Sequence, residues 1–369
     1  MGRRIILFIL VFQAILVASH WFVYRTWTHF QQAPDPRAIS VLGVAVAVLS
    51  VTFLTASLLA WRYRALPFRI YYRIAAVWLG FFNFFFLAAC ACWLVYGLGR
   101  ALRLPWPRQD IAFLLFGLAA AAGLYGVVNA ARVRVRRVPV KLPNLPANWR
   151  GRVAALVTDT HLGHVRGPRF AKRIVAMVSR FKPDVILIGG DLYDGTAANV
   201  RKLAEPLRGL SAPYGAYFIA GNHEEFGDHT KYLEAVSSAG VRVLNNEKVV
   251  LDGLQLIGVH YRDATDAEHL RAILRHTGLD PRQASILLTH APDQLAVAAE
   301  EGIGLQLSGH THGGQFYPFT WFTRRIYGRF VYGLNRLGSL LVYTSYGAGT
   351  WGPPVRVGTR PEIVLFTFE

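Results

Sequence analysis

The stretch Gly309-His-Thr-His-Gly-Gly-Gln315 is the most informative part of this 369-residue chain. It places two imidazoles, His310 and His312, directly after an alternating apolar run at residues 304–308. In an extended backbone, side chains two residues apart project to the same side, so both rings are expected to reach one metal ion. The alternative is that both histidines are ordinary polar residues of a loop. The segments on the N-terminal side of this heptapeptide decide between the two interpretations.

The excess of positive charge is confined to the first part of the chain. The formal net charge of +18 and a pI of about 10.3 could indicate a protein that binds nucleic acid. Residues 1–150 hold 17 Lys and Arg against 2 Asp and Glu, whereas residues 151–369 hold 23 against 20. The second part therefore carries a net charge of only +3, so no nucleic-acid partner is expected and a nuclease is disfavoured.

Four apolar runs lie in the first 131 residues, at 5–24, 39–61, 70–98 and 111–131. Each is close to or longer than the roughly 20 residues that cross a bilayer as a helix, and none contains an acidic residue. One such run could be a buried core helix or a signal sequence, but four in succession predict a membrane module of four transmembrane helices. Residues 1–131 are therefore expected to anchor a multi-pass integral protein of the cell membrane, with the lipid bilayer as its partner.

The Lys and Arg residues of the loops predict the orientation of this module. The N-terminal end, the second loop and the segment after the fourth run contain 11 of them, and the other two loops contain 5. The part of the chain after the fourth run is therefore expected on the cytoplasmic side. Residues 133–142 partly alternate, however, and could be a strand whose arginines serve the following domain. Without the five charges after the fourth run the counts are 6 and 5, which decides little.

Beyond the proline-punctuated stretch at residues 143–146, short β-rich runs alternate with amphipathic segments. Strands are expected at residues 153–157, 185–188, 217–220, 254–259, 286–288, 305–307, 340–344 and 363–368. Helices are expected at residues 169–181, 199–207, 230–238 and 267–275. Residues 132–150 are interpreted as a linker with a first strand, and residues 151–369 as one α/β domain with two layers of strand flanked by helices.

Polar residues follow five of these runs, at the point where each strand is expected to end. They are Asp159 and His161, then Asp191 and Asp194, then Asn222, His223 and Glu224, then His290, and finally His310 and His312. Since α/β enzymes bind ligands at the carboxyl ends of their strands, all five blocks are expected at one rim. Each block alone could be a helix cap, a turn or a surface histidine, but their joint occurrence in this order makes the set specific.

The order Asp-x-His, Gly-Asp-x-x-Asp, Gly-Asn-His-Glu, a lone His and Gly-His-x-His resembles the calcineurin-like metallophosphoesterase superfamily, over about residues 150–369. The full heptapeptide, the Leu-Pro-Asn-Leu-Pro lead-in at residues 142–146 and the apolar N-terminal part resemble its subgroup of transmembrane metallophosphoesterases. Some bacterial relatives in that neighbourhood cleave the pyrophosphate of UDP-diacylglucosamine. The resemblance implies two divalent metal ions as cofactors, and imidazole with carboxylate ligands suits Mn, Fe, Zn or Co.

The resemblance also assigns roles to the residues of the five blocks. The first metal would be bound by Asp159, His161 and His312, and the second by Asn222, His290 and His310, with Asp191 bridging both. The two rings of the heptapeptide would then serve different ions, so the one-metal picture drawn from spacing alone is too simple. His223 would approach the scissile phosphate and either protonate the leaving oxygen or stabilise developing charge, and Asp194 and Glu224 would orient imidazoles.

The implied function is membrane-anchored hydrolysis of a phosphodiester or pyrophosphate by hydroxide that the metals activate, on a lipid-linked substrate such as UDP-diacylglucosamine. The alternative is a non-catalytic, metal-bound scaffold or a lipid-sensing membrane protein. The complete ligand set together with His223 favours catalysis, because a scaffold has no need of a leaving-group acid.

Residues 316–332 directly follow the last expected ligand and combine many aromatic side chains with three arginines, Arg324, Arg325 and Arg329. Aromatic side chains with arginines suit a bilayer interface or a lipid-phosphate substrate. The alternative is that these aromatics simply pack a long loop onto the domain.

Overall fold

A computed structural model describes residues 3–32, 35–104, 106–196, 198–226 and 228–369 of the chain. The chain divides into two compact units. The first comprises Met1–Val128 with Gly352–Val355, and the second comprises Asn129–Trp351 with Arg356–Glu369.

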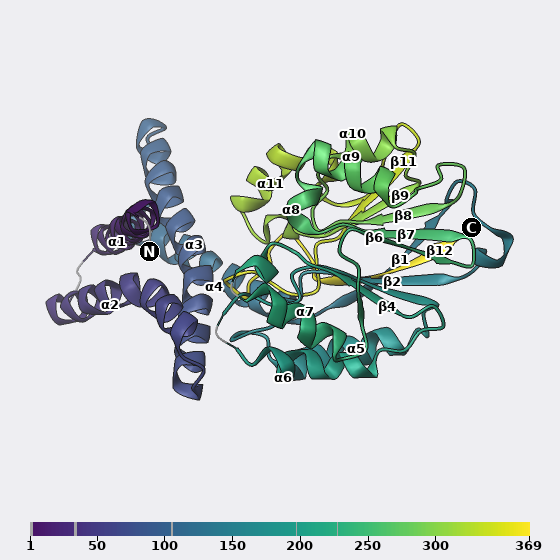
Figure 1. The fold of residues 1–369 in the computed structure, drawn as a ribbon. Coiled ribbons are helices and arrows are strands. Elements are labelled where there is room, and N and C mark those ends of the chain that lie inside the picture. The colour runs from purple at the N-terminus through teal and green to yellow at the C-terminus, as the bar shows by residue number, and fades with distance from the viewer. Residues whose placement is uncertain (1–2, 33–34, 105, 197, 227) are drawn as a thin grey trace. The chain divides into compact units, whose positions relative to one another are not determined.

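The first unit is built from four long helices, coloured purple to blue in Figure 1: α1 (Arg3–Phe30), α2 (Pro36–Arg62), α3 (Leu66–Ala101) and α4 (Arg108–Ala131). All four are long and apolar enough to cross a membrane. Large apolar side chains such as Phe8, Val41 and Leu94 are exposed on them, as expected of helices that face lipid. Helix α2 begins before the predicted apolar run because Asp35 and Pro36 provide a helix start that hydropathy does not detect: the Asp35 side chain accepts the N–H of Arg37.

The second unit contains two mixed six-stranded sheets. The first sheet has the order β1-β12-β2-β3-β4-β5 and the second has the order β10-β11-β9-β8-β7-β6. The strands of the first sheet are β1 (Arg134–Val140), β12 (Glu362–Phe368), β2 (Val153–Val157), β3 (Val185–Gly189), β4 (Ala216–Ile219) and β5 (Arg242–Val243). The strands of the second are β10 (Gly333–Leu337), β11 (Leu340–Thr344), β9 (Leu305–Ser308), β8 (Ser285–Leu288), β7 (Leu254–Gly258) and β6 (Glu247–Leu251).

Helices cover the outer faces of the two sheets, which lie face to face in Figure 1. Helices α5 (Pro168–Ser179), α6 (Val200–Ala204) and α7 (His229–Ser237) cover the first sheet, and α8 (Tyr261–Ala264), α9 (Ala267–His276) and α10 (Leu295–Glu300) cover the second. The central core lies between the sheets, where Leu156 and Leu187 of the first belong to the same cluster as Leu256 and Leu305 of the second. Because both faces of the central strands are buried, these strands read as continuous apolar runs. The predicted fold class, four apolar helices followed by a two-layer α/β domain, is confirmed.

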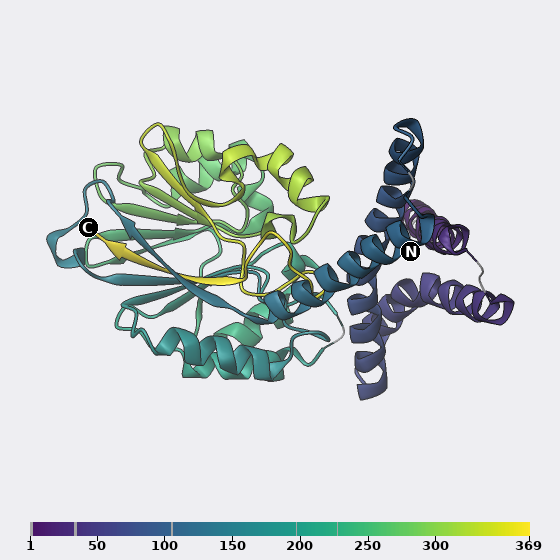
Figure 2. The ribbon, with the colours of Figure 1, turned by 180° about the vertical axis from the view of Figure 1, so that it is seen from behind.

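The strand β1 is the alternating segment that follows the fourth helix. It pairs in parallel with β12, and Figure 2 shows the two strands side by side from behind. Its arginines, Arg134, Arg136 and Arg137, therefore belong to the sheet. They are weak evidence for the orientation of the helices, and the cytoplasmic placement stays a prediction.

The segment at residues 316–332 is not a long loop. It forms the helix α11 (Phe319–Tyr327) and the short 3₁₀ helix η5 (Gly328–Val331). The helix escapes a search for buried apolar periodicity because none of its residues is fully buried.

Candidate metal centre

Five strands deliver the polar blocks to one place. The strands β2, β3 and β4 are parallel neighbours in the first sheet, and β8 and β9 are parallel neighbours in the second. The structure brings the side chains that follow them into three overlapping groups, in each of which the ligand atoms lie within 4.8 Å of one another. These groups are Asp159 with His161 and His312, His161 with Asp191 and His223, and Asp191 with His290 and His310.

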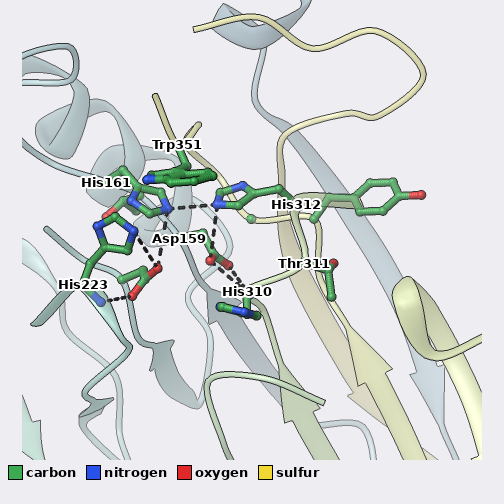
Figure 3. Close-up of polar contacts among 12 residues, drawn as sticks. Asp159, His161, His223, His310, Thr311, His312 and Trp351 are labelled. Atoms are coloured by element: carbon green, nitrogen blue, oxygen red, sulfur yellow. Dashed lines mark hydrogen bonds and ion pairs between the residues drawn. The ribbon is translucent and has the colours of Figure 1, made fainter. Parts of the chain in front are cut away.

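In the first group, the Nε2 atoms of His161 and His312 are 2.9 Å apart (Figure 3). Asp159 Oδ1 lies 3.7 Å from His312 Nε2. Two imidazole nitrogens at this separation can share at most one proton, and both rings are buried. A buried pair of nitrogen lone pairs beside a carboxylate is a donor set that fits a divalent cation.

In the group of Asp191, His290 and His310, three atoms converge on His290 Nε2. They are Asn222 Oδ1 at 3.1 Å, His310 Nδ1 at 3.1 Å and Asp191 Oδ2 at 3.2 Å. The other ring nitrogen of His290, Nδ1, donates to the carbonyl oxygen of Gly189 at 2.9 Å. This bond leaves Nε2 to face the group, which is the usual arrangement of a histidine that binds metal.

Asp191 lies between the two groups. Its Oδ2 atom is 3.2 Å from His290 Nε2 and 3.7 Å from His161 Nε2, so one carboxylate oxygen faces both. Burial alone would raise the pKa of Asp191, but the charge of His290 and its hydrogen bond outweigh burial and bring that pKa below its usual range. Burial likewise opposes charge on His290, yet Asp191 raises the pKa of this imidazole to about 10. Without metal, the two form a buried ion pair at the centre of the site.

The other three histidines of the two groups are held neutral, whereas Asp159 stays mostly ionised at neutral pH although burial raises its pKa to about 6. Burial, reinforced by the charge of His290, lowers the pKa of His310 to about 4. Burial also brings the pKa values of His161 and His312 well below the usual value of histidine. Neutral imidazoles carry the lone pairs that a metal ion requires.

The backbone at the site is strained in the same way at five positions. Asp159, His161, Asp191, His310 and His312 all have positive φ, between 47° and 67°. Residues other than glycine rarely adopt this left-handed conformation, and such strain concentrates at functional sites.

This strain explains why the extended geometry expected for His310 and His312 is wrong. The strand β9 ends at Ser308, and the 3₁₀ helix η4 (His312–Gly314) begins at the second histidine. The intervening turn sends the ring of His310 to the group of His290 and the ring of His312 to the group of His161.

Two glycines allow the strands to approach the carboxylates. A Cβ atom added to Gly221 would lie 2.2 Å from Asp191 Oδ1, and one added to Gly309 would lie 2.2 Å from Asp159 Oδ2. Carbon and oxygen atoms cannot come this close without a shift of the backbone or of the carboxylate. The first position of the Gly-Asn-His-Glu and Gly-His-x-His blocks must therefore be glycine, because any side chain there would overlap a carboxylate of the site.

His223 lies at the edge of the site beside His161 (Figure 3), with the two ring centroids 4.7 Å apart. Its backbone N–H donates to Asp191 Oδ1 at 2.9 Å, and its Nδ1 donates to the backbone carbonyl oxygen of Asp194 at 3.1 Å. These two bonds direct Nε2 inward, 3.9 Å from Asp191 Oδ2. The ring is therefore oriented with one nitrogen available to a reacting group.

Asp194 and Glu224 support the site in a different way from the one expected. Asp194 orients His223 through its backbone carbonyl, while its carboxylate accepts the N–H and the hydroxyl of Thr196. The carboxylate of Glu224 accepts three backbone N–H groups, from Gly221 at 2.7 Å, Asp191 at 2.9 Å and Tyr193 at 3.0 Å. Glu224 thus fixes the loops that carry the ligands, and no imidazole is among these partners.

Sequence reasoning misses a fully buried guanidinium behind the first group. Arg356 Nη2 donates to His312 Nδ1 at 2.9 Å and to the carbonyl oxygens of Tyr346 and Gly349 at 2.6 and 2.8 Å. Burial lowers the pKa of Arg356 to about 10, so the group is charged at neutral pH. Nothing in the surrounding Gly- and Pro-rich sequence marks this arginine, because its partner lies far away along the chain.

The last residue of the heptapeptide positions an exposed indole beside the site. The side-chain amide of Gln315 donates to the carbonyl oxygen of Trp351 at 2.8 Å and accepts its N–H at 3.0 Å. The indole of Trp351 lies beside His161 in Figure 3, and its centroid is 6.2 Å from that of His223.

The three arginines expected near the substrate lie on the segment after η4. Arg324 and Arg325 are exposed on α11, and Arg329 donates to the carbonyl oxygen of Arg336 at 2.9 Å. The C-terminal end of α11 borders the site, because the ring centroid of Tyr327 is 6.4 Å from that of His310.

Comparisons with known proteins agree with this geometry. Residues 153–314 match the family model described as calcineurin-like phosphoesterase. The chain is 34% identical over 277 residues to a transmembrane protein with metallophosphoesterase domain from Danio rerio, a match that covers 69% of this chain and 62% of that protein. It is 32% identical over 254 residues to an uncharacterized metallophosphoesterase of Campylobacter jejuni, covering 67% of this chain and 66% of the relative. It is 29% identical over 262 residues to an uncharacterized metallophosphoesterase of Aquifex aeolicus, covering 68% of this chain and 98% of the relative. The matched part thus spans less than two thirds of the length of the first two relatives.

Proposed function

Because residues 153–314 make this chain a member of the calcineurin-like phosphoesterase family, we propose that it is a membrane-anchored, dimetal phosphohydrolase. Its reaction is the hydrolysis of a phosphodiester or pyrophosphate bond. The observation that carries the proposal is the single carboxylate oxygen of Asp191 that faces two groups of metal-ligand atoms. Asp191 and the two groups would hold two cations, and these would supply an activated water and charge neutralisation at the phosphoryl oxygens.

The donor sets support the following assignment of ligands. One cation would be held by Asp159, His161 and His312, and the other by Asn222, His290 and His310, with Asp191 shared. Nitrogen and oxygen donors in this mixture suit Mn, Fe, Zn or Co. Arg356 and Gly189 hold the outward-facing nitrogens of His312 and His290, so each ring presents its other nitrogen to the cation.

His223 is proposed as the general acid of the reaction. Its Nδ1–H is bonded to the carbonyl oxygen of Asp194, so Nε2 is the nitrogen that can pass a proton to the leaving oxygen. A metal-bound scaffold or a lipid sensor would not need an imidazole oriented in this way, and we therefore rank that alternative second.

The substrate is proposed to be a lipid-linked phosphate, with UDP-diacylglucosamine as one example. Support comes from the four helices that are long and apolar enough to cross a membrane and from the exposed arginines of α11. We propose that all four helices span the bilayer and that the catalytic domain lies on the cytoplasmic side. Arg324 and Arg325 then contact the phosphate groups of the substrate or of neighbouring lipids, while Arg329 stabilises the base of this segment.

The test is hydrolysis by the purified full chain supplied with Mn, on bis-p-nitrophenyl phosphate, phospholipids and UDP-diacylglucosamine. The variant Asp191→Ala is expected to lose bound metal and to lower turnover on the order of a thousandfold, because both cations lose a ligand. Glu300→Ala, which removes an exposed carboxylate of α10, is the matched control and should leave turnover unchanged.

Two results would refute the proposal. Retained turnover by Asp191→Ala with metal supplied would exclude the dimetal mechanism. A wild-type chain that binds two metal ions but hydrolyses none of the three substrates would favour the scaffold.

A further inference from the structure

Helix α11 displays its apolar side chains to the outside. Its exposed residues include Phe319, Trp321, Phe322 and Ile326, whose exposed fractions lie between 49% and 73%. The half-buried positions are Thr320, Thr323 and Tyr327, which recur at the spacing of one helix face. A surface helix of a soluble domain normally has the opposite arrangement, with its apolar stripe toward the core. The polarity of α11 is therefore inverted.

The inverted helix is firmly attached to the metal centre. A Cβ atom added to Gly314 of η4 would lie 2.3 Å from the backbone of Phe319, so the helix begins in close contact with the heptapeptide. The ring of Phe316 is buried and packs edge-on against that of Phe319 at 5.5 Å. At the other end, Tyr327 is next to His310. The exposed apolar side chains thus belong to a helix that is held in place at both ends.

Cationic groups share the outer surface of the helix. Arg324 and Arg325 are exposed, and the guanidinium of Arg325 lies 5.5 Å from the ring centroid of Trp321. Aromatic and aliphatic side chains interspersed with arginines are the composition of helices that lie in the headgroup region of an anionic bilayer. Trp321 suits this position because the indole has an apolar body and one polar N–H.

The first unit of the chain also points to a bilayer as the surface that α11 meets. The same polypeptide carries four helices long and apolar enough to cross a membrane, so on the proposed anchorage the domain that bears α11 is tethered to a bilayer. Such tethering gives even a weak surface contact a high effective concentration.

We propose that α11 is an interfacial helix, which seats the catalytic domain on a bilayer surface with anionic headgroups. Phe319, Trp321, Phe322 and Ile326 enter the headgroup region, and Arg324 and Arg325 pair with lipid phosphates. The metal centre, directly preceding α11 in the chain, then opens close to the plane of the headgroups, where a lipid-linked phosphate can reach it without leaving the bilayer. This inference rests on the proposed membrane anchorage, but it does not require the proposed hydrolysis.

The depth of α11 can be measured without any catalytic activity. The full chain, with Cys90 and Cys92 replaced by alanine, would carry a single nitroxide label at Phe322→Cys in nanodiscs of phosphatidylcholine with phosphatidylserine. The label is expected to collide with oxygen more often than with a water-soluble nickel chelate, as lipid-immersed sites do. Val250→Cys on β6, which is 57% exposed, is the matched control and should favour the nickel chelate.

Either of two outcomes would overturn the proposal. If the labels at positions 322 and 250 showed equal access to the nickel chelate, α11 would lie in water. If the label at position 322 were shielded from both reagents, a protein surface rather than lipid would cover the helix.

A kinetic experiment separates this inference from the proposed function. Phe322→Ser with Ile326→Ser is expected to lower turnover of UDP-diacylglucosamine in the same nanodiscs about tenfold, because the lipid contact of two apolar side chains is lost. Turnover of soluble bis-p-nitrophenyl phosphate and bound metal should stay at wild-type values. Equal losses on both substrates would refute the interfacial role. A wild-type chain inactive on both substrates would refute only the proposed reaction, since the nitroxide measurement would still decide the position of α11.

Discussion

Two regions depart in opposite ways from the usual burial of apolar and exposure of polar side chains. One is the floor of the candidate metal centre, formed by its buried polar residues, and the other is its rim, formed by α11. At the floor, polar groups such as Asp159, His290 and Arg356 are fully buried, and each has a hydrogen-bond partner: Asp159 Oδ1 accepts the backbone N–H of His310 at 3.0 Å, His290 donates to Gly189, and Arg356 donates to His312. At the rim, apolar groups such as Trp321 and Ile326 are exposed. Buried charge and exposed apolar surface both cost stability unless a partner is present. On the function and the interfacial role proposed above, the buried polar residues would determine which reaction is possible, and α11 would determine where the substrate is met.

The largest expected effect comes from His223, which belongs to the floor. His223→Gln removes the proton donor and should lower kcat by about 10²- to 10⁴-fold, equally on soluble and lipid-linked substrates. Bound metal, measured by mass spectrometry, should stay at two ions per chain. The exposed His276→Gln serves as the matched control. Loss of one metal ion in His223→Gln would instead make this residue a ligand, as its grouping with His161 and Asp191 permits.

A smaller effect is expected from the guanidinium behind His312. Arg356→Met removes the donor to Nδ1 and should weaken metal binding by about 10- to 100-fold, the usual cost of losing the hydrogen-bond partner of a metal-binding histidine. Arg356→Lys keeps the positive charge and should recover part of that affinity. Competition with a chelator measures the effect, and circular dichroism establishes that each variant is folded. A folded Arg356→Met with wild-type affinity would show that the guanidinium has no part in positioning the ring.

The smallest expected effect is that of pH on metal affinity, and it should involve only the buried residues of the floor. Asp191 raises the pKa of His290 to about 10 in the metal-free site, so at neutral pH a metal ion must displace that proton. Affinity for metal should therefore rise with pH, by up to about tenfold per unit, until the pH passes the pKa of His290. Calorimetry in buffers of different ionisation enthalpy would detect the released proton. Metal affinity that does not change from about pH 7 to about pH 9 would contradict this ion pair, and the rim label at position 322 should be insensitive to the same change.

The central strands and the site residues were predictable for one shared reason. Buried strands such as β2, β3 and β8 read as unbroken apolar runs, and a polar residue directly after such a run stands out. Asp159, Asp191 and His290 were found in this way.

The strands that escaped prediction are all at sheet edges. They are β5 in the first sheet and β6 and β10 in the second, and β1 at the remaining edge was recognised only as an alternating segment. An edge strand has one neighbour and exposes part of its surface, so its residues alternate or include charge, as Glu247 and Lys248 do in β6. Sequence periodicity is weakest where a strand is least buried.

Local backbone geometry and distant partners were also beyond the sequence. The positive φ of His310 and His312 is not encoded in the alternation of the preceding strand, and the turn places the two rings in different groups. Arg356 reaches His312 from a segment with no motif of its own. The orientation of α11 could not be read because its residues face outward in a pattern that matches neither a buried helix nor a loop.

The strand order β1-β12-β2 has a consequence for biosynthesis. β1 leaves the ribosome directly after the four helices, and β2 follows soon afterwards, but the strand that lies between them is the last of the domain to be made. Until residues 362–368 emerge, β1 has no neighbour in its sheet and β2 has an open edge on that side. Closing this gap joins segments separated by more than two hundred positions of chain, the kind of long-range pairing that folds slowly. The first sheet is therefore completed only after synthesis has passed β12, and the nascent chain must protect an unpaired strand until then.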